Sequence, residues 1–258
     1  MSRACGGATT TSMSSAEGTP FLASPKMTSG KFFGVSALVF ATSAAATLIG
    51  CESMSAMGEM RMPGGWTMSM TWMRMPGQTW AASAASFVGM WIVMMVAMML
   101  PSLAPTLWSY GQAVAATGAR IARLTSFVAL GYFFIWAALG FAVFQAGVAL
   151  ASAAIHQPEF ARAVPVIGGG VALIAGLLQL TPWKAHHLAF CRDAHRHAHA
   201  SEAGDFAACM HGMRLGLHCV YSCVPFTAIL LVFGVNNLHA MVVVAAAITA
   251  ERVGVAPR

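Results

Sequence analysis

Charged side chains are scarce in this sequence: Asp, Glu, Lys and Arg together make up 9% of its 258 residues. A typical soluble domain is about 25% charged, so this chain has too few charges to cover the surface of a soluble fold. Hydrophobic residues make up 58% of the sequence, and the mean hydropathy is +0.69. This composition excludes a disordered chain, a disulfide scaffold and a nucleic-acid-binding domain, and it predicts a polytopic membrane protein.

Sequence signatures of catalysis are also missing. No P-loop, dinucleotide fingerprint or Ser/His/Asp set stands out, and no general acid–base pair or activated nucleophile is evident. We therefore do not expect an enzyme. The six cysteines do not form a typical disulfide set, because four of them cluster late in the chain with histidines among them. That pattern favours metal ligation or buried thiols.

Long apolar runs are abundant, and they predict an all-α bundle of about six transmembrane helices. A spanning helix needs about 20 largely apolar residues. The expected spans are residues 32–51, 86–108, 124–152, 163–182, 215–235 and, shorter than the others, 238–251.

The domain organisation follows from these spans. Residues 1–31 are rich in Ser, Thr, Gly and Ala and are expected to form a disordered N-terminal tail. Residues 32–258 form the transmembrane domain, with a Met-rich outer loop at 52–85 and a His-rich inner loop at 184–213. An alternative start at Met27 would make Cys51 a lipoprotein site, although an ordinary first helix is the favoured interpretation.

The distribution of positive charge predicts the orientation. With a cytoplasmic N-terminus, the inner segments carry eleven of the fourteen Lys and Arg residues, and the outer loops carry three. Basic residues concentrate on the cytoplasmic side of membrane proteins. We therefore expect a multi-pass protein in the bilayer of a bacterial inner membrane, with no nucleic-acid partner despite the net charge of +6.

Methionine is the most unusual component of the chain. Eight methionines fall in the outer loop: Met54, Met57, Met60, Met62, Met68, Met70, Met73 and Met75. Five more fall in the second span: Met90, Met94, Met95, Met98 and Met99. A thioether is a soft, neutral donor that suits Cu(I) and needs no deprotonation. The alternative is that methionine serves as a flexible apolar filler, which is a stronger alternative within the span than in the loop.

A second group of candidate ligands lies on the inner side. His187 and Cys191 are four residues apart and next to the membrane, and imidazole plus thiolate suits copper or zinc. The three histidines that follow can be ligands or part of a solvated linker: His195, His197 and His199.

The fifth span carries a third group. Gly212, Gly216, Cys219 and Cys223 share one helix face, and the two cysteines suit a linear or trigonal Cu(I) site. His218 lies on a neighbouring face and needs a partner within the membrane. The two glycines, together with Gly168–Gly170 and Gly176 in the fourth span, predict close helix packing. Glu251-Arg252 is interpreted as a solvated helix end.

Three elements occur in an order that resembles a family of bacterial predicted metal-binding integral membrane proteins. They are Met90-Trp91-x-x-Met94-Met95-x-Ala97-Met98-Met99-x-Pro101, Gln179-x-Thr181-Pro182-x-Lys184…Cys191-Arg192 and Cys219-x3-Cys223…Gly234-Val235-Asn236-Asn237. One member of this family is regarded as a membrane copper chaperone for a tyrosinase. The resemblance implies metal binding by the methionine ridge, the Cys-Arg element and the two-cysteine helix. Where the family usually has adjacent cysteines, this chain has Ser222 and Cys223.

These observations predict a Cu(I)-binding membrane protein that supplies an extracytoplasmic copper enzyme. The expected metal ligands are Met90, Met94, Met95, Met98, Met99, His187, Cys191, His218, Cys219 and Cys223. Zinc is an alternative metal at the Cys/His cluster. Two other functions stay open: a membrane oxidoreductase or haem-binding subunit with His187, His211 or His218 as axial ligands, and an assembly scaffold whose Met and Cys only pack.

Overall fold

The computed structural model describes residues 29–56, 58–73, 77–114, 118–193, 204–234 and 237–253, and these ranges are built almost entirely from α-helices. The seven helices within them are α1 (Ser29–Ala56), α2 (Trp80–Ala113), α3 (Gly118–His156), α4 (Pro158–Leu178), α5 (Pro182–Asp193), α6 (Asp205–Phe233) and α7 (Leu238–Val253). A short antiparallel hairpin, β1 (Glu59–Arg61) and β2 (Thr67–Ser69), and the 3-10 turn η1 (Met70–Trp72) connect α1 to α2. The prediction of an all-α fold is confirmed.

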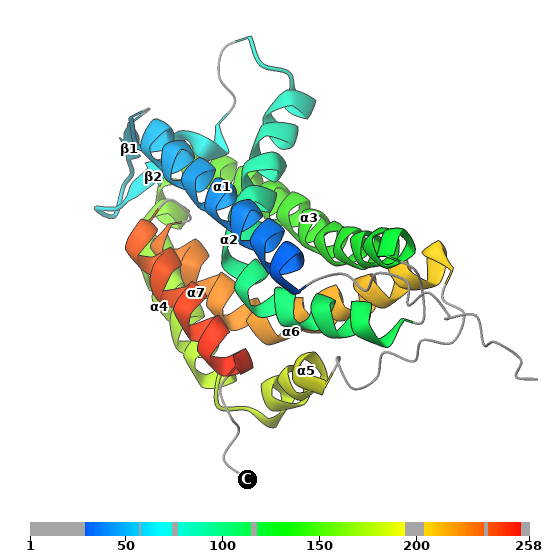
Figure 1. Ribbon diagram of the computed structural model, residues 1–258. Coiled ribbons are helices and arrows are strands. Elements are labelled where there is room, and N and C mark those ends of the chain that lie inside the picture. Colours follow the sequence, from blue (N-terminus) through cyan, green and yellow to red (C-terminus); the bar gives the residue numbers. More distant parts are fainter. Residues whose placement is uncertain are drawn as a thin grey trace, which may run out of the picture.

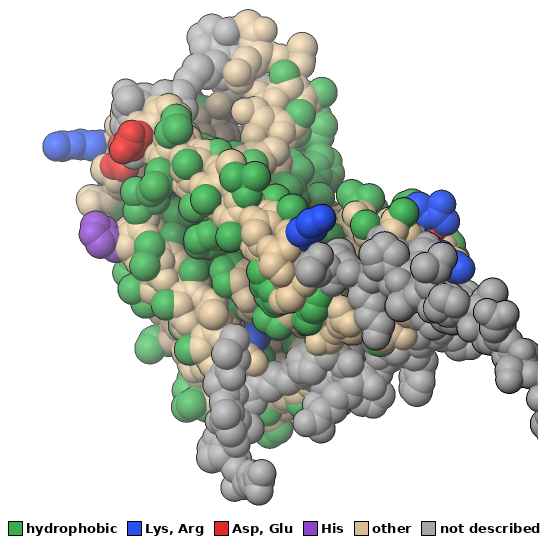
Figure 2. Space-filling view, in the orientation of Figure 1, with side chains coloured by type: hydrophobic (Ala, Val, Ile, Leu, Met, Phe, Trp, Pro, Cys, Tyr) green, Lys and Arg blue, Asp and Glu red, His purple; other side chains and the backbone are tan. Residues whose placement is uncertain are grey.

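Five of these helices are long and apolar enough to cross a membrane: α1, α2, α3, α4 and α6. The expected sixth span forms α7, which has 16 residues and is shorter than a spanning helix requires. The hairpin and α5 lie at opposite ends of the bundle (Figure 1). Hydrophobic side chains cover a broad area of the face that α1 occupies, with few charged side chains among them (Figure 2).

Several helix ends differ from the predicted boundaries. Helix α2 begins at Trp80, because the Thr79 side chain caps it by accepting a hydrogen bond from the Ala82 amide, so the outer loop is shorter than expected. Helix α4 ends at Leu178, and Pro182 then begins α5 as a separate helix, a position that proline favours. Within the inner loop expected at 184–213, residues 184–193 and 205–213 are therefore helical, and residues 194–203 lie outside the described residues. Residues 29–31 belong to α1, and the rest of the expected tail lies outside the described residues.

Helices α3 and α6 cross in the most extensive contact of the bundle. A Cβ atom at Gly212 would overlap the carbonyl oxygen of Val128, and one at Gly216 would lie 2.8 Å from the carbonyl oxygen of Tyr132. This confirms the close packing predicted for the fifth span, because only glycine allows backbones to approach this closely.

The glycines of the fourth span behave differently. A Cβ atom at Gly169 or Gly170 would meet nothing within 4 Å, and the same holds for Gly176. The prediction of close packing is wrong for these three positions. Helix α4 contacts α6 near Gly168, where a Cβ atom would lie 3.5 Å from Val232, but the other three glycines lie on the face that exposes large apolar side chains such as Leu173.

Candidate metal centre

Two cysteine side chains of α6 lie together, and a third from α5 lies in the same hydrophobic core. Cys219 and Cys223 lie one turn apart on α6, hydrogen-bond to each other and are 0% and 2% exposed. Cys191 on α5 is 7% exposed and lies close enough to Cys219 for their charges to interact. We call Cys191, Cys219 and Cys223 the thiol group. The prediction that these cysteines share one part of the molecule agrees with this arrangement, and all three are thiols rather than disulfide halves.

Arg252, in the last turn of α7, points into the thiol group. Its Nη2 donates to the sulfur of Cys219 and lies 3.8 Å from the sulfur of Cys223. Its Nη1 donates to the Ser102 hydroxyl of α2 at 3.2 Å. The interpretation of Glu251-Arg252 as a solvated helix end is therefore wrong. Because α7 packs against both α2 and α6, its final turn reaches the thiols instead of solvent.

Neutral hydroxyl groups complete the surroundings of the thiols. The Tyr132 hydroxyl on α3 lies 2.8 Å from the sulfur of Cys219. The Ser222 hydroxyl donates a hydrogen bond to the Cys219 carbonyl at 2.9 Å and lies 3.8 Å from the sulfur of Cys223. Tyr132 is fully buried. Sequence reasoning missed it, because a single tyrosine in an apolar helix gives no signal of its partner 87 residues away.

Helix α5 is fixed in place by a buried lysine. Lys184 is 3% exposed, lies 2.6 Å from a carboxylate oxygen of Glu251 on α7, and also contacts the Gln179 side chain. Its ammonium group sits over the ring of Phe226 on α6. Lys184 and Cys191 are seven residues apart and so share one face of α5. These contacts hold the Cys191 thiol against α6, and burial raises the pKa of that thiol to about 11.

Two of the predicted histidine ligands form a separate pair. The Nδ1 atoms of His187 on α5 and His218 on α6 lie 2.9 Å apart, and the ring of Phe190 stacks on His218. Burial lowers the pKa of His187, and the neighbouring His186 lowers it further. A neutral imidazole is the form that binds metals. The same two helices thus carry a half-buried histidine pair and the buried thiol group. His195, His197 and His199 lie outside the described residues.

The methionine ridge of the second span is buried in the bundle. Met94, Met95, Met98 and Met99 are each at most 5% exposed and belong to the same core cluster as the thiol group. Met90 is only partly buried and packs near Gly50 of α1. We call these five residues of α2 the methionine ridge. Ser102 connects the inner end of the ridge to Arg252. Its hydroxyl donates a hydrogen bond to the Met99 carbonyl at 2.9 Å and accepts one from Arg252.

The outer methionines serve at least partly as core residues. Met62 and Met68 are buried in a small second core with Ala151, Ala154 and Ala161. Their burial agrees with the filler interpretation for these two. The other described methionines of this loop are half-buried, and Met57 and Met75 lie outside the described residues.

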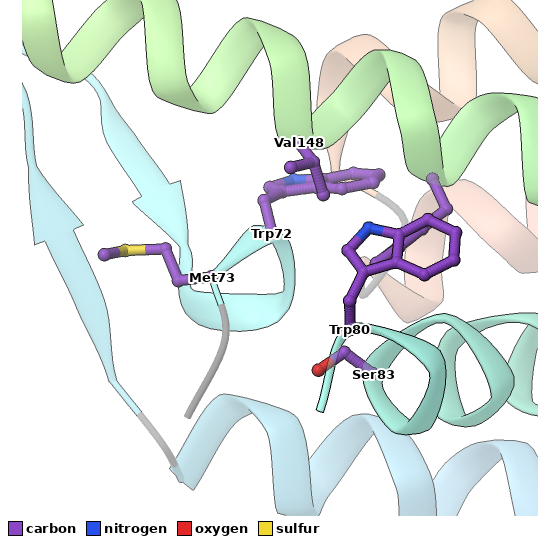
Figure 3. Close-up of a pocket in the computed structure, with 6 residues that line it drawn as sticks. Trp72, Met73, Trp80, Ser83 and Val148 are labelled. Carbon is purple, nitrogen blue, oxygen red and sulfur yellow. The ribbon is translucent and has the colours of Figure 1, made fainter. Parts of the chain in front are cut away.

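A small hollow lies beside this loop. It is lined by Trp72 of η1, Trp80 and Ser83 of α2, and Phe144 and Val148 of α3. Met73 also borders the hollow, but its thioether points away from both indole rings (Figure 3). The hollow is thus an aromatic recess rather than a cluster of sulfur donors.

The arrangement limits how a metal ion could be held. Within the described parts of the chain, no three His, Cys, Asp or Glu side chains are grouped so that they could share one ion. A site with four such ligands, as structural zinc requires, is therefore not formed by these residues. Two sulfur donors are enough for linear Cu(I), and Cys219 and Cys223 offer two adjacent thiols.

Comparison with known proteins identifies the family. Residues 88–258, about two thirds of the chain, match the model of the PpoB2 copper chaperone family. The chain therefore belongs to this family, and the resemblance noted in the sequence is confirmed. The match covers α2 from Val88 onward and all later helices, and so includes the methionine ridge and the thiol group. No curated protein and no solved structure matches the chain.

Proposed function

We propose that this protein is a Cu(I) chaperone of the bacterial inner membrane that supplies an extracytoplasmic copper enzyme. The observation that carries the proposal is the buried pair of Cys219 and Cys223, with Cys191 in the same core, in a protein that belongs to a copper chaperone family. Copper is the cargo in this account. Thiol and thioether donors favour Cu(I) over the hard divalent ions.

The apolar helices and the positions of the basic residues support the membrane location. If the N-terminus is cytoplasmic, α1 through α4 return the chain to the cytoplasmic side, and the thiol group then lies toward that side with Lys184 and Arg252. Basic residues favour the same side. The methionine ridge then extends from the thiol group toward the outer leaflet, where the β-hairpin lies.

The proposed transfer of Cu(I) depends on the difference in affinity between the cysteine thiols and the methionine thioethers. Binding to cysteine releases the thiol protons, and the Tyr132 hydroxyl remains to donate a hydrogen bond to the Cys219 sulfur and fix its orientation. Thioethers bind the ion more weakly and need no deprotonation. Exchange of the ion among Met98, Met94 and Met90 can therefore move it outward along the ridge. The His187–His218 pair is a second place to hold copper on the inner side.

The haem alternative gains no support from the histidines. Two axial ligands on opposite sides of an iron atom must be separated by roughly twice a metal–nitrogen bond of about 2 Å. The Nδ1 atoms of His187 and His218 contact each other at 2.9 Å instead. The ring of His211 stacks on Tyr110.

Replacing Met94 and Met98 by leucine tests the relay. Leucine keeps the apolar volume and removes the sulfur. With the variant reconstituted in vesicles and loaded with Cu(I) under reducing conditions, we expect release to a membrane-impermeant Cu(I) chelator outside to be about tenfold slower, with the amount bound at the thiol group unchanged.

The matched control is Met62→Leu, which changes a methionine buried in the second core. This control should release copper at the wild-type rate. Equal rates for all three proteins would contradict the relay. A wild-type protein that binds no copper would contradict the chaperone function and favour the scaffold.

A further inference from the structure

The guanidinium of Arg252 is a positive charge placed inside the candidate metal centre. Its Nε is buried, its Nη1 donates to Ser102, and its Nη2 contacts the sulfurs of both α6 cysteines. The hydroxyls that face the same sulfurs, Tyr132 and Ser222, are neutral. On the same two helices, α5 and α7, Lys184 and Glu251 form a pair whose charges cancel. The positive charge of Arg252 therefore interacts directly with any ion that Cys219 and Cys223 bind.

The charge balance depends on the charge of the ion. When two cysteine thiols bind Cu(I), their two protons leave to solvent, and the resulting complex carries one negative charge. The guanidinium neutralises it. With a divalent ion on the same two thiolates the complex is neutral, and the positive charge of Arg252 is then left without compensation. An uncompensated charge at a buried site is strongly disfavoured.

We propose that Arg252 makes the Cys219–Cys223 pair selective for soft monovalent ions over equally thiophilic divalent ions. This inference rests on the proposed function, because it assumes that Cys219 and Cys223 bind the cargo. It adds discrimination by ionic charge, which the softness of the sulfur donors does not provide. Thiolates also bind soft divalent ions such as Cd(II), so the donor atoms by themselves do not discriminate by charge.

The wild-type protein allows a first test. Ag(I) and Cd(II) are both thiophilic and are not reduced by the thiols, but they differ in charge. With the full chain in detergent under reducing conditions, we expect Ag(I) to bind and to compete with Cu(I), and about a hundredfold excess of Cd(II) to leave the bound Ag(I) in place. Comparable affinities for Ag(I) and Cd(II) would overturn the proposal.

Cd(II) also prefers more ligands than Ag(I), so variants of Arg252 are needed to isolate the effect of its charge on the two affinities. Arg252→Gln should lower the ratio of Ag(I) to Cd(II) affinity at least about tenfold, because the charge is lost. Arg252→Lys keeps the charge and should preserve the ratio. Arg120→Gln removes an exposed charge from α3 and is the matched control. An unchanged ratio in Arg252→Gln would overturn the proposal.

A second variant covers the case in which Arg252→Gln does not fold. Ser102→Asp places a carboxylate against the guanidinium, which now contacts the serine hydroxyl, and should lower the ratio in the same way. If neither variant folds, comparable affinities of the wild type for Ag(I) and Cd(II) would still overturn the proposal. Loss of Ag(I) binding in Cys219→Ser/Cys223→Ser is the separate test of the proposed function. If that variant still binds Ag(I), the thiol site itself is wrong, whereas an unchanged ratio alone rejects only the role of Arg252.

Discussion

Replacing both Cys219 and Cys223 by serine should weaken Cu(I) binding at least about a hundredfold, because a hydroxyl oxygen is a poor donor for this soft ion. Serine is chosen because it can still hydrogen-bond to Tyr132 and Arg252, which contact the Cys219 sulfur. A buried polar group left without a partner would destabilise the bundle and confuse the result. Affinity is measured by competition with a Cu(I) chelator under reducing conditions.

Cys209→Ser is the matched control for this variant. Cys209 lies on the same helix, α6, but is only half-buried and is not part of the thiol group. We expect its affinity for Cu(I) to equal that of the wild type. If the double variant also keeps wild-type affinity while remaining folded, the copper is bound elsewhere, with the His187–His218 pair as the next candidate.

The second large effect concerns the fold. Gly212→Leu should disrupt the crossing of α3 and α6, because even a Cβ atom at this position overlaps the Val128 carbonyl oxygen. Overpacking of this kind costs about 1–3 kcal/mol, and more when backbone must move. For a protein of this size, we expect the melting temperature in detergent to fall by at least about 5 °C.

Gly169→Leu is the corresponding control on α4, where the added side chain would meet nothing within 4 Å of its Cβ. It should melt at the wild-type temperature. A Gly212→Leu protein as stable as this control would show that α3 and α6 do not cross as closely as described. Because α6 carries both cysteines, copper binding should fall together with stability in Gly212→Leu.

Much of the fold was predictable because it depends on local hydrophobicity. The long apolar runs located the five spanning helices, and the spacing of Gly212 and Gly216 identified the closest helix contact. Helix α5 was not predicted as a separate element. It has only 12 residues, and only three residues separate it from the end of α4. The glycines of α4 were misinterpreted because a small-residue pattern does not reveal whether a partner helix is present.

The candidate site was predictable only in part. Residue chemistry pointed to Cys191, Cys219 and Cys223, and the helical period placed the last two on one face. The remaining groups, Tyr132 and Arg252, come from helices far away in the sequence, and their role depends on how α3 and α7 pack against α6. The sequence contains no local signal for such a contact.

The methionines show in the same way that the sequence does not reveal how its side chains pack. By sequence alone the ridge and the outer loop have similar chemistry, but in the structure they belong to two different cores. Met95 and Met99 lie in the same core cluster as the thiols, whereas Met62 and Met68 fill a second core next to the hairpin. Sulfur content alone could not distinguish donors from packing residues, because both uses favour the same side chain.

X-ray absorption at the copper edge of the Cu(I)-loaded full chain tests the central claim most directly. The thiol group and methionine ridge predict a first coordination shell made of sulfur, with two short copper–sulfur bonds that disappear in Cys219→Ser/Cys223→Ser. A shell dominated by nitrogen or oxygen, unchanged in that variant, would contradict the account.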